Sequence, residues 1–83
     1  MPGHRKGTAM LRLYGRRYCH LCEDMALALR ARGVAFEEYD VDADEALEAR
    51  YGDRVPVLTD AAGVEICFGR LDEPALQARL AVR

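Results

Sequence analysis

Several features that define other classes of protein are missing from this sequence. No apolar run approaches the roughly 20 residues that a membrane-spanning helix needs. The first eight residues, MPGHRKGT, lack the apolar stretch of a secretion signal, so we expect a cytoplasmic protein with no membrane partner. No internal repeat or low-complexity tract is present, and 83 residues suffice for one domain only.

Neither a strong net charge nor an array of paired cysteines is present. The formal net charge is −2, which argues against a nucleic-acid partner. Three cysteines, an odd and small number, do not suggest a disulfide framework. The composition, 51% hydrophobic and 31% charged, is that of a globular domain.

The charges that are present are unevenly spread. Seven basic residues precede Gly33, whereas eight of the 14 acidic residues lie between Glu37 and Asp53. A positive field around the stretch YCHLC, residues 18–22, would favour thiolates there. The alternative is that most of these charges form a solvated surface.

Hydrophobic periodicity predicts alternating strands and helices. Strands are expected at 9–15, 34–41, 55–59 and 64–68, the last two as a hairpin around the turn DAAG. A helix is expected from Cys22, ending at Gly33. A second helix would start at a capping box formed by Asp42 and Glu45, and a third would follow Asp72, with Leu76 and Leu80 facing the core.

The resulting order is β-α-β-α-β-β-α. The first βαβ unit requires two parallel strands, and the hairpin adds an antiparallel pair. We therefore predict an α/β fold in which three helices cover a four-stranded mixed sheet. Residues 9–83 would form this single domain, after a flexible tail of residues 1–8.

Two cysteines lie where the first strand gives way to the first helix. Cys19 would precede the helix, where free N–H groups and the helix dipole stabilise a thiolate, assisted by Arg16, Arg17 and His20. Cys22, one turn further on, would be more buried and protonated. This arrangement predicts an exposed attacking thiol and a buried resolving thiol.

Other interpretations of the two cysteines need features that are scarce here. A structural zinc site usually takes four ligands, often from two paired clusters, and no second cluster is present. A purely structural disulfide is disfavoured in a reducing compartment. A carrier of Cu(I), zinc or an iron–sulfur cluster through the two thiolates is the alternative function. Cys67, in the last strand, is interpreted as a small buried hydrophobic residue.

The stretch RVPVL supplies a second element of the predicted site. A proline opening a strand can follow a cis peptide bond. A cis Val55–Pro56 bond would free the backbone of Val55 to pair with an extended substrate beside Cys19.

Together, LYGRRYCHLC, RVPV and GRLDEPAL resemble the glutaredoxin family of the thioredoxin fold over residues 9–83, especially its small bacterial glutaredoxin-like members. The resemblance implies a thiol–disulfide oxidoreductase with glutathione and disulfide-containing proteins as partners. It implies glutathione as reductant, with no tightly bound cofactor. We expect no metal, since too few ligands are present, and a monomer by default. Cys19 would be the nucleophile and Cys22 the resolving cysteine.

The resemblance also implies a glutathione site. Arg16 would contact the glycine carboxylate, Val55 and Pro56 the cysteinyl backbone, and Gly69 and Asp72 the γ-glutamyl end. Three departures bear on this site: His20 and Leu21 replace the usual Pro-Tyr, Arg54 replaces a threonine, and Arg70 replaces the second glycine of a pair.

Overall fold

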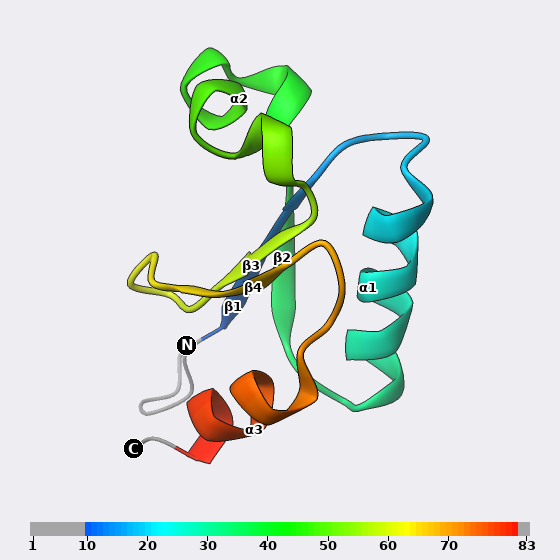
Figure 1. Ribbon diagram of the computed structural model, residues 1–83, viewed down its shortest axis with the longest axis vertical. Coiled ribbons are helices and arrows are strands. Elements are labelled where there is room, and N and C mark those ends of the chain that lie inside the picture. Colours follow the sequence, from blue (N-terminus) through cyan, green and yellow to red (C-terminus); the bar gives the residue numbers. More distant parts are fainter. Residues whose placement is uncertain (1–9, 82–83) are drawn as a thin grey trace, which may run out of the picture.

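The computed structural model describes residues 10–81. The predicted tail, residues 1–8, lies outside this range. The elements are β1 (Leu11–Gly15), α1 (His20–Ala31), β2 (Phe36–Asp40), η1 (Val41–Ala43), α2 (Glu45–Tyr51), η2 (Gly52–Arg54), β3 (Val57–Thr59), β4 (Glu65–Phe68) and α3 (Glu73–Ala81). Their order along the chain is the predicted one (Figure 1).

The four strands form one mixed sheet in the order β2-β1-β3-β4. β1 pairs with β2 in parallel, as expected for a βαβ unit, and β3 is antiparallel to both β1 and β4. The predicted α/β thioredoxin-like architecture is confirmed. Within residues 10–81, none of the helices is both long and apolar enough to cross a bilayer.

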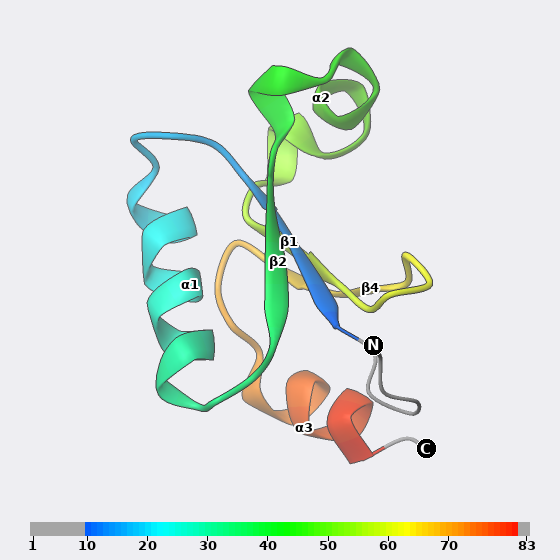
Figure 2. The ribbon, with the colours of Figure 1, turned by 180° about the vertical axis from the view of Figure 1, so that it is seen from behind.

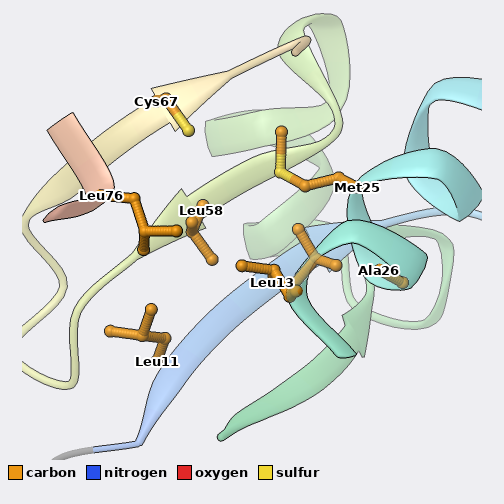
Figure 3. Close-up of a cluster of buried hydrophobic side chains, with 8 residues drawn as sticks. Leu11, Leu13, Met25, Ala26, Leu58, Cys67 and Leu76 are labelled. Atoms are coloured by element: carbon orange, nitrogen blue, oxygen red, sulfur yellow. The ribbon is translucent and has the colours of Figure 1, made fainter. Parts of the chain in front are cut away.

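One face of the sheet is covered by α1 and α3, and we call it the aliphatic face. Its buried side chains are almost all aliphatic: Leu11, Leu13, Met25, Ala26, Leu29, Leu58, Cys67 and Leu76. Figure 3 shows Leu13 of β1 and Leu58 of β3 between Met25 of α1 and Leu76 of α3. Alternation along β1 directs Leu11 and Leu13 to this face. The packing of Met25 and Leu29 fixes α1, and therefore its N-terminus, against the sheet.

The opposite face is covered by α2, and we call it the tyrosine face (Figure 2). Tyr14 and Tyr51 are 5% exposed and stack with ring centroids 4.3 Å apart, together with buried Val41 and Val57. Tyr39 stacks on the other side of Tyr14 at 5.2 Å. This smaller cluster holds α2 over the end of the sheet from which the chain leaves for α1.

Two helix starts differ from the sequence prediction. α1 begins at His20, two residues before Cys22, because the Cys19 sulfur caps the helix. α2 is capped by Asp44, whose Oδ1 accepts hydrogen bonds from the amides of Ala46 and Leu47. The predicted capping box of Asp42 and Glu45 is wrong, because burial of Val41 draws the chain into the 3₁₀ turn η1 before the helix begins.

Two further expectations are corrected, one for Leu80 in α3 and one for the start of β3. Leu80 is 45% exposed, because α3 turns Arg79 inward to pair with Asp60 at 3.2 Å. β3 begins at Val57 and not at the residues before it, since the chain runs through a turn at Pro56. The cap of α3 agrees with the sequence: Asp72 Oδ1 accepts a hydrogen bond from the amide of Ala75.

Candidate active site

Cys19 occupies the N-cap of α1 and is half-buried. Its Sγ accepts a hydrogen bond from the amide of Cys22 at 3.2 Å, and its carbonyl accepts one from Glu23 at 3.0 Å. The sulfur thus satisfies one of the free N–H groups of the first turn. The N–H dipoles of the first turn of α1 point toward this sulfur.

Cys22 is the buried partner, with 8% of its surface exposed. Burial and the hydrogen bond with Cys19 raise the pKa of Cys22 to about 11, and the backbone of Arg16 partly offsets this. Gly15 makes the close packing possible, since a Cβ at this position would stand 3.0 Å from Cys22 Sγ. The two thiols therefore occupy different environments within one helical turn, as the sequence predicted.

The residues around the two thiols are open to solvent. Tyr18, immediately before Cys19, is 93% exposed and adopts a left-handed φ of 58°. A non-glycine residue in this conformation costs about 1–2 kcal/mol. His20 and Leu21 are exposed on the first turn of α1. No feature of the sequence indicates the left-handed conformation of Tyr18.

Pro56 and Gly69 come together at the same end of the sheet. The Val55–Pro56 bond is cis, and the carbonyl of Pro56 accepts a hydrogen bond from the amide of Gly69 at 2.8 Å. Pairing of Tyr14 with Val57 places this segment beside the end of β1, where the chain leaves for Cys19 (Figure 1). Val55 is half-buried and packs against the tyrosine face.

The side chain of Arg16 makes contacts that the sequence analysis did not identify. Its Nη1 lies 3.1 Å from Asp42 Oδ1, and its Nη2 lies 2.8 Å from Glu48 Oε1. Nη2 also donates a hydrogen bond to the carbonyl of Gly52 at 3.0 Å. The guanidinium is thus engaged by η1, α2 and η2. The only signal in the sequence was the concentration of acidic residues between 37 and 53.

Four more residues named in the sequence analysis lie near the β3–β4 hairpin and the start of α3. Arg54 pairs with Glu65 at 2.5 Å and lies over the ring of Phe68, 5.5 Å from its centroid. Arg70 is exposed. Asp72 is exposed and engaged in capping α3. Cys67 is buried, and burial raises its pKa.

A cavity of about 520 Å³ adjoins Cys22 between α1 and the edge strand β2. Of the residues to which the sequence analysis gave a role, Arg16, Arg17 and Cys22 line it. Within residues 10–81, no group of three or more His, Cys, Asp or Glu side chains is arranged to hold a metal ion.

A thioredoxin-like sheet with a Cys-x-x-Cys pair at the start of α1 defines the class of the molecule. The model of the family described as "Glutaredoxin-like domain (DUF836)" matches residues 10–81, and the chain belongs to this family. No curated protein matches the chain.

Solved structures agree with this assignment. A protein from Nitrosomonas europaea, solved by NMR, is 34% identical with a TM-score of 0.81, over 96% of this chain and 100% of the other. A structural-genomics target protein from X. campestris, solved by X-ray crystallography, is 48% identical with a TM-score of 0.71, over 84% and 93%. The crystal structure of a glutaredoxin from Archaeoglobus fulgidus shares the fold, at 22% identity and a TM-score of 0.63, over 96% and 100%.

Proposed function

We propose that the protein is a thiol–disulfide oxidoreductase that reduces protein disulfides or glutathione mixed disulfides. The observation that carries this proposal is the environment of Cys19: half-buried, at the N-cap of α1, with the amide of Cys22 directed at its sulfur. The family relationship and the shared fold with a glutaredoxin support it.

The proposed reaction begins at Cys19. Its thiolate attacks one sulfur of the substrate disulfide, and that S–S bond breaks as the new one forms. The departing thiolate takes up a proton. Cys22 then loses its proton, and its thiolate attacks Cys19 Sγ, which releases the second substrate thiol. The two electrons gained by the substrate come from the cysteine pair, which ends as a disulfide.

The different environments of the thiols fix the order of these steps. At neutral pH, a pKa of about 11 keeps Cys22 protonated and therefore unable to attack first. Once Cys19 carries the substrate, Cys22 is one helical turn away and attacks intramolecularly. Glutathione, the proposed reductant, would return the pair to its reduced form by the same exchange in two steps.

Substrate contacts are proposed at the end of the sheet around Cys19. His20 and Leu21 are exposed beside the thiols, and Pro56 and Gly69 are joined by a hydrogen bond at the neighbouring sheet end. Val55 and Pro56 would contact the backbone of the substrate cysteine. Gly69, Arg70 and Asp72 would form the far end of the site, and Arg16 the near end. We propose a monomer in the cytoplasm, with glutathione and disulfide-containing proteins as partners.

The test is glutathione-dependent reduction of hydroxyethyl disulfide, coupled to glutathione reductase. Wild type and Cys22→Ser are both expected to turn over, and Cys19→Ser is expected to be inactive. Full activity of Cys19→Ser would overturn the proposal. If wild type fails with glutathione but works with thioredoxin and its reductase as donor, the reaction stands and the donor changes.

A further inference from the structure

The single positive charge of Arg16 is paired with two negative charges. One guanidinium meets two carboxylates, those of Asp42 and Glu48, at 3.1 and 2.8 Å. These three side chains together carry a net charge of −1. Arg16 is the third residue before Cys19, and its backbone lies against the Cys22 thiol. The group therefore adds a net negative charge at the near end of the proposed active site.

The local backbone is shaped to allow this contact. A Cβ at Gly52 would stand 2.5 Å from the Glu48 carboxylate, so the carboxylate lies directly over the glycine. The same glycine offers its carbonyl to Arg16 at 3.0 Å. Any side chain at this position would push Glu48 away from Arg16. Gly52 thus leaves room for the carboxylate of Glu48 and accepts a hydrogen bond from Arg16.

The group remains accessible to a substrate. The Arg16 side chain is 32% exposed, and those of Asp42 and Glu48 are 51% and 48% exposed. A carboxylate arriving here must displace one of the two resident carboxylates or join a group that is already negative. A neutral amide meets no such repulsion, and a basic side chain is attracted.

We propose that Asp42 and Glu48 are specificity-determining residues that direct the enzyme toward polypeptide disulfides. A chain that continues beyond its cysteine presents a neutral amide at this end of the site, whereas free glutathione presents a carboxylate. The inference rests on the proposed function, because it concerns substrates that react at Cys19. Exposed ion pairs have modest energies, so the expected discrimination is about 2- to 5-fold in rate.

The test compares two disulfides that differ only in this group: oxidised glutathione and its bis(glycine amide). The Cys22→Ser background isolates the attack by Cys19, and the mixed disulfide is followed by mass spectrometry. Rates are divided by those of free N-acetylcysteine with the same disulfides, which removes their intrinsic difference in reactivity. We expect the amide to react about 2- to 5-fold faster, with the preference shrinking as salt is raised.

Variants that remove one charge each then test whether Asp42 and Glu48 cause the preference for the amide. Glu48→Gln and Asp42→Asn, in the same background, should each reduce the ratio, and the double variant should abolish or reverse it, because Arg16 is then free to bind a carboxylate. Glu45→Gln is the matched control: it removes one exposed acid from the same helix, and Glu45 makes no ion pair with Arg16. Its ratio should stay near that of the background.

The outcomes separate this inference from the proposed function. Equal rates, or faster reaction of oxidised glutathione, would overturn the inference and leave the oxidoreductase intact. A preference for the amide that survives in the double variant would also overturn it. No reaction of Cys19 with either disulfide would overturn the proposed function and, with it, this inference.

Discussion

The two faces of the sheet are covered by different kinds of side chain. The aliphatic face packs α1 and α3 through leucines and Met25, and its central side chains, Leu29 and Leu58, are fully buried. The tyrosine face is smaller and relies on stacked rings, and beside it lies the exposed polar group around Arg16. The comparison separates two tasks: one face holds the thiol-bearing helix in place, and the other presents charge to the end of the sheet where the thiols lie.

The largest expected effect is on the aliphatic face. Leu58→Ala leaves a cavity between α1 and α3 at a position with no exposed surface, and should cost about 2–5 kcal/mol of unfolding free energy. Urea denaturation followed by circular dichroism measures it. Leu80→Ala, at a residue that is 45% exposed, is the matched control and should change stability by less than about 0.5 kcal/mol. Similar losses for the two variants would contradict the assignment of the core.

A smaller effect is expected on the tyrosine face. Tyr51→Leu keeps an apolar side chain but removes the stacking with Tyr14, which is worth about 0.5–1.5 kcal/mol beyond burial. We expect a loss of about 1–2 kcal/mol in the same denaturation experiment. Tyr39→Leu, at a half-buried ring 5.2 Å from Tyr14, should lose less. A loss for Tyr51→Leu as large as that for Leu58→Ala would remove the distinction between the two faces.

The buried thiol of Cys22 in α1 gives a pH-dependent prediction. The pKa of Cys22 rises from 9.0 to about 11 on folding, so the folded state binds this proton more tightly than the unfolded state. Its contribution is constant below about pH 8 and is lost between pH 9 and 11. The loss should reach about 1 kcal/mol by pH 10.

The measurement is the difference in unfolding free energy between wild type and Cys22→Ala, taken at pH 8 and pH 10 under reducing conditions. The effect of Cys67, whose pKa is also raised by burial, is common to both proteins and cancels. A difference that is independent of pH would show that Cys22 has an ordinary thiol environment.

Local sequence patterns predicted most of the aliphatic face, with Leu80 of α3 as an exception. The alternation of residues 10–14 places Leu11 and Leu13 on one side of β1. The four-residue spacing of Leu21, Met25 and Leu29 indicates the inner face of α1, and it holds for Met25 and Leu29 but not for Leu21, which is 39% exposed. The position of the cysteines at the strand–helix junction followed from the same patterns, because both periodicities change there. Asp72 as a helix cap was equally local, and it was confirmed.

The tyrosine face was harder to predict because its contacts join distant residues. The stretch DVDADE offers several acidic caps, and only the burial of Val41 selects Asp44 over Asp42. Asp42 and Glu48 meet Arg16 across 26 and 32 positions, which no local pattern encodes. The prediction that Leu80 faces the core was wrong for a similar reason. Arg79 turns inward to pair with Asp60, which is distant in the sequence.

The smallest expected effect lies at the junction between the faces, where Tyr18 takes a left-handed φ of 58°. Its ring is 93% exposed, so it gains little packing to offset the strain. Asparagine tolerates this conformation better than tyrosine, and Tyr18→Asn should therefore stabilise the fold by about 0.5–1 kcal/mol. Tyr18→Ala is the control, since it removes the ring but keeps the strain. Both are measured by urea denaturation, and a stability of Tyr18→Asn no higher than that of Tyr18→Ala would contradict the strain.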